Sequence, residues 1–102
     1  MEEKKECCHC HKKKERSEKE YKDLVHRLNR IEGQIRGIQK MLENDAYCND
    51  ILVQSSAVSA AMNAFNKELL SSHIHSCVVR DIQEGKTEVV DELMNTLQKL
   101  MK

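Results

Sequence analysis

Residues 47–77 read YCNDILVQSSAVSAAMNAFNKELLSSHIHSC, and this stretch organises the rest of the chain. It predicts one long helix, with Cys48 near its start and with His73 and Cys77 near its end. Residues four apart share one face of a helix, so His73 and Cys77 should be neighbours. At the rise of an α-helix, Cys48 lies roughly 37 Å from His73, whereas metal–ligand bonds are only about 2.0–2.3 Å long. If the three residues bind one ion, Cys48 must therefore come from a second, antiparallel copy of the chain.

The middle of this helix has the composition of a close helix crossing. Around Met62 four positions carry small side chains, namely Ala57, Ala60, Ala61 and Ala64. The distance between two packed helices depends on the side chains at their contact, so small residues allow a close approach. We predict a self-complementary, two-fold dimer interface with one metal site at each end.

Length and composition favour a small helical protein that oligomerises. The chain has 102 residues, 39% of them hydrophobic and only three aromatic, so a single copy has little apolar surface to bury. It has no Pro, three Gly and 33% charged residues, which is typical of long helices with polar outer faces. No apolar run approaches the roughly 18 residues of a membrane span, and residues 1–20 are almost wholly polar. We expect a cytoplasmic protein without membrane contact, in which five cysteines serve metal or redox chemistry rather than a disulfide framework.

The charges are unevenly spread along the chain. Residues 1–40 carry twelve Lys and Arg against eight acids, and the remainder carries five against nine. A basic half of a neutral protein suggests a face for phosphate, although a solvated surface of mixed charge is the simpler interpretation.

Residues 1–16 are predicted to form a disordered arm, because they are charged and lack apolar periodicity. The arm contains a dense soft-ligand tract, Cys7, Cys8, His9, Cys10 and His11. Without the second half of a zinc-finger pattern, the tract is either an accessory copper or zinc site or a tail with incidental thiols.

The remaining residues, 17–102, predict three helices and an all-α protomer. Ser17 can cap the first helix, whose apolar stripe has spacings of four and three: Leu24, Leu28, Ile31, Ile35, Ile38 and Leu42. Basic residues are expected on its opposite face, namely Lys22, Arg27, Arg30, Arg36 and Lys40. Gly33 and Gly37, four apart, suit the close approach of another helix.

The boundaries of the other two helices follow from turn residues. Asn44 should end the first helix in a left-handed conformation, with Asp45 capping the second helix, which runs to Arg80 or Gln83. Gly85 should close the second helix, and Thr87 should cap a third over residues 88–101, with Val89 or Val90 on its apolar side. The short first loop makes the first two helices antiparallel, and two such hairpins would form a four-helix bundle.

Two thiolates and one imidazole make a three-ligand set. Thiolates select Cu(I), which accepts three ligands, whereas structural zinc sites take four. The set therefore favours Cu(I) over Zn(II). Two buried cysteines and a surface histidine are, however, also ordinary in a helical protein without metal.

Several of these residues together resemble the copper-sensing transcriptional repressors of the CsoR/RcnR family. The resemblance rests on the segment RLNRIEGQIRGI at residues 27–38, on YC followed by DILVQ at residues 47–54, and on His73 and Cys77. It covers about residues 17–102. It implies an all-helical dimer of dimers without a helix-turn-helix, which binds operator DNA when metal-free. It also implies release of the DNA on Cu(I) binding and control of copper-efflux genes.

The resemblance also implies roles for single residues. Cys48 of one subunit, with His73 and Cys77 of the other, would bind Cu(I). Tyr47 and Glu92 match positions that couple copper to DNA release through the ligand imidazole. The DNA contacts match Arg27, Arg30 and Gln34 on the first helix.

Related functions remain open on the sequence alone. Nickel and cobalt sensors add a histidine near the start of the first helix, where this chain has none, and persulfide sensors lack the histidine that stands here as His73. A cytosolic copper buffer without DNA binding is a further alternative that the cysteine-rich arm suits. An enzyme is not expected, because His73 and Cys77 have no evident orienting third group.

Overall fold

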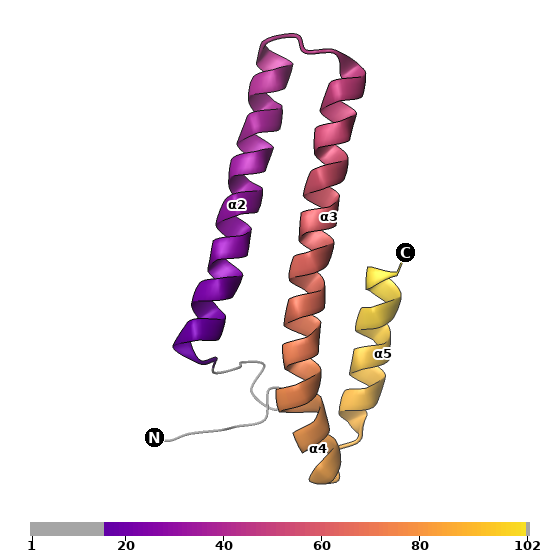
Figure 1. Cartoon of the computed structure of the whole chain (residues 1–102). Helices are drawn as coiled ribbons and strands as arrows, with labels where there is room; N and C mark the ends of the chain where they lie inside the picture. Colours follow the sequence, from indigo (N-terminus) through magenta and orange to yellow (C-terminus); the bar gives the residue numbers. More distant parts are fainter. Residues whose placement is uncertain (1–15, 102) are drawn as a thin grey trace. The chain divides into compact units, whose positions relative to one another are not determined.

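The computed structural model describes residues 16–101, and all its regular elements are helical. In chain order they are α2 (Glu18–Glu43), α3 (Cys48–His73), the π-helical turn η1 (Ile74–Val78), α4 (Val79–Gln83) and α5 (Glu88–Leu100) (Figure 1). The prediction of an all-α protomer is confirmed. Contacts group the described residues into two units, residues 16–69 and residues 70–101, and each is described by itself.

Helix α2 starts where the sequence predicts. Ser17 has an extended backbone, and its hydroxyl oxygen accepts a hydrogen bond from the backbone N–H of Glu20 at 3.1 Å. Glu18 and Glu20 lie in the first turn, where acidic side chains favour the positive end of the helix dipole. The prediction of a serine cap is therefore confirmed.

The turn between α2 and α3 differs from the expectation. Asn44 is not left-handed, with φ −99°, and the left-handed residue is Asp45, with φ 56°. The N–H of Ala46 reaches the carbonyl of Met41 at 2.9 Å, and the N–H of Asp45 reaches that of Leu42 at 3.2 Å. These two bonds are the Schellman arrangement, which places the left-handed residue one position after the cap. Asp45 therefore ends α2 and does not cap α3.

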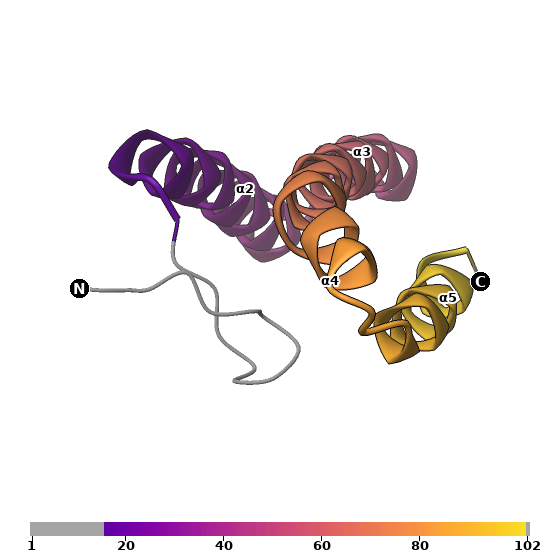
Figure 2. The ribbon, with the colours of Figure 1, turned by 90° about the horizontal axis from the view of Figure 1, so that it is seen from below.

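Helix α3 begins one residue later than the quoted stretch. The carbonyl of Tyr47 accepts the N–H groups of Asp50 and Ile51 at 3.0 and 3.2 Å, so Tyr47 precedes the first helical residue, Cys48. Within residues 16–69, α2 and α3 are antiparallel, as both views of the ribbon show (Figures 1 and 2).

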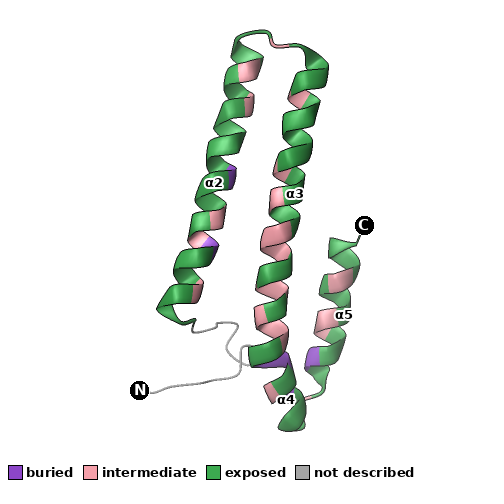
Figure 3. Cartoon of the chain, in the orientation of Figure 1, coloured by how far each residue is buried: buried purple, intermediate pink, exposed green. Residues whose placement is uncertain are grey.

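The apolar stripe of α2 is only partly covered within one chain. Leu24 and Ile31 are 7% and 5% exposed, but Leu28, Ile35 and Leu42 remain 40%, 51% and 62% exposed. Helix α3 contains no fully buried residue, and exposed positions dominate both helices in Figure 3. Apolar residues at helix spacing that stay exposed are typical of a face that another chain covers.

The glycines of α2 are not explained by packing within the chain. Among the described residues, no heavy atom beyond the helix's own backbone lies within 4 Å of where a Cβ at Gly33 or Gly37 would stand. The close approach of another helix to Gly33 and Gly37 therefore stays a prediction, and that helix would belong to another chain.

In residues 70–101, α3 continues without a break through η1 and α4. Helix α4 ends at Gln83, which is one of the two end points that the sequence predicts. Gly85 has φ 83°, and its N–H reaches the carbonyl of Ile82 at 3.0 Å. The N–H of Lys86 reaches the carbonyl of Asp81 at 2.8 Å, which completes a second Schellman arrangement. The prediction that Gly85 closes this helix is confirmed.

Helix α5 packs against α4 through a small core. Val89 is 1% exposed and Val90 is 40% exposed, which settles the choice that the sequence left open. Cys77 and Val78 are buried in the same unit, together with the carboxylate residue Asp81. Thr87 precedes α5 as predicted, but its backbone is already helical and its hydroxyl makes no capping bond. None of the helices in residues 16–101 combines the length and the apolarity that crossing a membrane requires.

Candidate metal centre

Cys48 is the exposed ligand candidate. It is the first residue of α3, its thiol is free, and it follows Tyr47, whose side chain is 72% exposed. An exposed thiol at a helix terminus is accessible to a second protein chain.

His73 and Cys77 lie at the other end of α3. His73 is its half-buried last residue, and Cys77 lies in η1 with 2% of its surface exposed. Both belong to the same unit, so the structure brings these two candidates within about one helical turn. The sulfur of Cys77 is in a disulfide in this structure, and a metal ligand must be a thiolate. Reduction would therefore have to precede metal binding.

The turn that separates His73 from Cys77 is not α-helical. The N–H of Val79 bonds to the carbonyl of Ile74, five residues earlier, which defines a π turn. The sequence pattern predicts an uninterrupted α-helix here and does not reveal this turn.

Two polar side chains, His75 and Ser76, lie on the π turn, and the sequence pattern does not single them out. The Nδ1 atom of His75 lies 2.9 Å from the backbone carbonyl oxygen of Ser71, and the hydroxyl of Ser76 donates to the backbone carbonyl oxygen of Ser72 at 2.7 Å. The hydroxyl oxygen of Ser76 is also 3.7 Å from the sulfur of Cys77. A serine that can bond back to a carbonyl four residues earlier is a known cause of helix bending, and it was the available sequence signal.

Two other predicted site residues, Tyr47 and Glu92, belong to different units. Tyr47 belongs to residues 16–69, whereas Glu92 belongs to residues 70–101 and is half-buried on α5. Among the residues that the structure describes, no three His, Cys, Asp or Glu side chains are grouped to hold a metal ion. The tract formed by Cys7, Cys8, His9, Cys10 and His11, and the predicted arm apart from Arg16, lie outside the described residues.

The predicted DNA contacts share one side of α2. Arg27, Arg30 and Gln34 fall within about 60° of one another around the helix axis. Arg30 and Gln34 are exposed, while Arg27 is half-buried and borders the apolar stripe rather than opposing it. Arg36, elsewhere on the helix, is paired with Glu32 at 3.2 Å. Within residues 16–101 no ion pair engages Arg27 or Arg30, so both guanidinium groups are available to phosphate.

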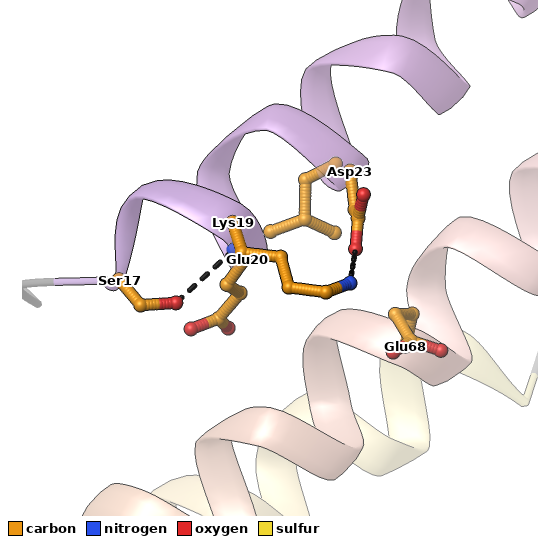
Figure 4. Close-up of a pocket in the computed structure, with 6 residues that line it drawn as sticks. Ser17, Lys19, Glu20, Asp23 and Glu68 are labelled. Atoms are coloured by element: carbon orange, nitrogen blue, oxygen red, sulfur yellow. Dashed lines mark hydrogen bonds and ion pairs between the residues drawn. The ribbon is translucent and has the colours of Figure 1, made fainter.

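A pocket of about 190 Å³ lies elsewhere in residues 16–69 (Figure 4). Its lining consists of Ser17, Lys19, Glu20, Asp23, Leu24 and Glu68. Lys19 pairs with Asp23 at 3.1 Å, and the Ser17 hydroxyl is used as the helix cap. None of the candidate ligands lines this pocket, so it is not the metal centre.

A family model and a protein of similar sequence both match this chain, and both are described as transcriptional repressors. Residues 20–99 match the family described as metal-sensitive transcriptional repressors. The chain is 50% identical over 88 residues to the copper-sensing transcriptional repressor CsoR of Bacillus subtilis, covering 85% of this chain and 87% of that protein.

Two solved structures are similar to most of this chain. The Cu(I)-bound copper-sensing repressor CsoR of Geobacillus thermodenitrificans superposes with a TM-score of 0.83 and 44% identity, over 86% of this chain and 93% of the other. The nickel-responsive transcriptional regulator InrS gives a TM-score of 0.67 and 35% identity, over 76% and 89%. The protein therefore belongs to the family of metal-sensitive transcriptional repressors.

Proposed function

We propose that this protein is a copper-responsive repressor, which binds operator DNA without metal and leaves the DNA when Cu(I) binds. The observation that carries this proposal is the set Cys48, His73 and Cys77 in a chain 50% identical to a copper-sensing repressor. The genes it controls would be those of copper efflux, and it would act in the cytoplasm.

The proposed metal centre spans two chains. Cys48 of one protomer would bind together with His73 and Cys77 of its partner, giving two sites in each dimer. The position of Cys48 and His73 as first and last residues of α3 supports this, because one helix cannot bring its two ends together. Two thiolates and an imidazole fit Cu(I), a soft ion, and fall short of the four ligands of structural zinc.

The proposed assembly is a homodimer that pairs into a homotetramer. Leu28, Ile35 and Leu42 on α2 stay exposed in one chain, and the four alanines of α3 offer a surface for close crossing. Covering these positions would form an antiparallel four-helix bundle. The tetramer would then be a dimer of such dimers, related by closed symmetry.

The proposed DNA surface is the side of α2 that carries Arg27, Arg30 and Gln34. Guanidinium groups neutralise phosphates and release counterions, so binding should weaken steeply as salt rises. Copper and DNA would favour different arrangements of the same assembly. By linkage, each must then weaken the binding of the other by the same factor.

Tyr47 and Glu92 would couple the metal centre to this change by orienting the imidazole of His73. Groups that hold a ligand imidazole commonly change metal affinity strongly. The Cys7, Cys8, His9, Cys10 and His11 tract would add an accessory site for copper or zinc.

Nickel is the second candidate inducer, because the fold also matches a nickel-responsive regulator. A persulfide is the third, because the chain has both thiols of the set, Cys48 and Cys77. The deciding experiment titrates the reduced, operator-bound protein anaerobically with Cu(I), Ni(II), Zn(II) and a persulfide donor in parallel. DNA release is followed by fluorescence anisotropy.

We expect release at stoichiometric Cu(I) and retention with the other three additions. Cys48→Ala provides the matched control and should bind operator DNA yet ignore Cu(I). Release by Ni(II) or persulfide at lower concentration than by Cu(I) would reassign the inducer. Failure of the wild-type protein to bind any DNA would remove the repressor proposal in favour of a copper buffer.

A further inference from the structure

The π turn η1 lies between the two metal-ligand candidates of one protomer. It begins at Ile74, directly after His73, and it contains Cys77. A π turn closes hydrogen bonds five residues apart and so holds one residue more than an α turn. Such turns are rare and frequently occur at functional sites.

Two side-chain hydrogen bonds tie this turn to the end of α3. The carbonyl oxygen of Ser71 can only accept, so the hydrogen bond across 2.9 Å requires the tautomer of His75 with a proton on Nδ1. The hydroxyl of Ser76 donates to the carbonyl oxygen of Ser72 across 2.7 Å. Both bonds reach back four residues, at the place where the backbone ladder changes from α to π spacing.

Ser76 also lies against a candidate ligand. Its hydroxyl oxygen is 3.7 Å from the Cys77 sulfur, so a reduced Cys77 thiol has this oxygen within reach as a hydrogen-bond acceptor. The hydrogen bond to Ser72 fixes the direction of that hydroxyl. The same side chain therefore holds the turn and limits where the Cys77 sulfur can lie.

We propose that His75 and Ser76 are positioning residues for the metal centre: they hold the π turn and so set the direction of Cys77 relative to His73. This inference rests on the proposed function and adds two residues that are not ligands. Without the two bonds the turn can relax to α spacing. Relaxation would rotate α4 by about 100° around the helix axis relative to α3, because one residue turns an α-helix by that angle.

The test measures Cu(I) affinity of the reduced, full-length protein by anaerobic competition with a chromogenic Cu(I) chelator. Ser76→Ala and His75→Ala each remove one of the bonds. Both positions are exposed, so the core is left intact. We expect each variant to lose about 10- to 100-fold in Cu(I) affinity, the usual effect of losing a group that orients a metal ligand.

Conservative variants separate positioning from a general loss of stability. Ser76→Thr keeps a hydroxyl that can bond to the carbonyl four residues earlier, and His75→Asn keeps an N–H donor near the place of Nδ1. Both should restore most of the affinity and the ultraviolet thiolate-to-copper absorption of the wild type. Ser59→Ala, at an exposed serine within α3, is the control and should bind Cu(I) like the wild type.

Operator affinity of the metal-free variants is measured alongside and should equal that of the wild type. Wild-type Cu(I) affinity in both alanine variants would overturn the positioning role while leaving the repressor intact. The positioning role would also be overturned if Ser76→Thr and His75→Asn failed to restore the Cu(I) affinity that the alanine variants lose. A wild-type protein that binds neither Cu(I) nor DNA would instead defeat the proposed function itself.

Discussion

Cys48 and His73 are the first and last residues of the same helix, α3. A helix of this length cannot fold back to bring its ends to one ion, so in the proposed metal centre each protomer would supply one ligand to one site and two ligands to the other. If the proposed function holds, copper binding therefore requires dimer formation.

The shared centre predicts rescue in mixed dimers. Each site of the proposed dimer takes Cys48 from one chain and the pair His73 and Cys77 from the other. Cys48→Ala removes the first contribution, and Cys77→Ala removes one ligand of the second. Each homodimer should lose tight Cu(I) binding. A dimer with one chain of each kind should regain one complete centre, because its intact Cys48 meets an intact His73 and Cys77.

The measurement is Cu(I) stoichiometry of co-expressed, differently tagged chains purified as the mixed dimer. We expect one tightly bound Cu(I) per mixed dimer, against two for the wild type. A mixed dimer that binds no better than the two homodimers would show that the ligands do not come from two chains.

Arg30 should matter for DNA but not for copper. Its guanidinium is exposed on α2 and, in the described part of the chain, enters no ion pair. Arg30→Ala should weaken operator binding and reduce the slope of log K against log salt by about 1, the loss of one phosphate contact. Cu(I) affinity of the metal-free variant should stay that of the wild type.

Arg36→Ala is the control for this prediction, since Arg36 already pairs with Glu32 at 3.2 Å. It should change the salt slope less than Arg30→Ala does. An equal change in both variants would mean that the DNA surface extends around α2 and is not confined to the side of Arg30.

The redox state of Cys77 should control the response to copper. Its sulfur is in a disulfide here, and a disulfide sulfur cannot act as a thiolate ligand. Oxidised protein should stay bound to operator DNA when Cu(I) is added, and a thiol reductant should restore release. Anisotropy of labelled DNA, with free thiols counted in parallel, checks this. Release from fully oxidised protein would exclude Cys77 as a required ligand.

Ser17 should contribute measurably to stability through its cap. Its hydroxyl accepts the N–H of Glu20 at 3.1 Å, so Ser17→Ala leaves that donor without its side-chain partner. The expected cost is about 1 kcal/mol in the free energy of unfolding. Urea denaturation at fixed protein concentration measures it, since oligomers unfold in a concentration-dependent way.

Thr87→Ala is the natural comparison, because Thr87 precedes α5 yet makes no side-chain capping bond. It should cost clearly less than Ser17→Ala. Similar losses at both positions would mean that the capping bond is not the source of the effect.

Much of this protein is determined by its sequence because the relevant signals are local. Ser17 and Gly85 mark helix limits through the geometry of single residues, and both are confirmed. The apolar spacing from Leu24 to Leu42 predicts α2 in the same way. The separation of Cys48 from His73 follows from counting residues along a helix, which needs no coordinates.

Only the tertiary structure decided several other features. The π turn that contains Cys77, the side-chain bonds of His75 and Ser76, and the burial of Val89 rather than Val90 were not evident from spacing. A single π turn inside an α-helix is rare and has no fixed sequence spacing. The choice between α and π spacing therefore depends on neighbouring side chains and packing, which a pattern along the chain does not contain.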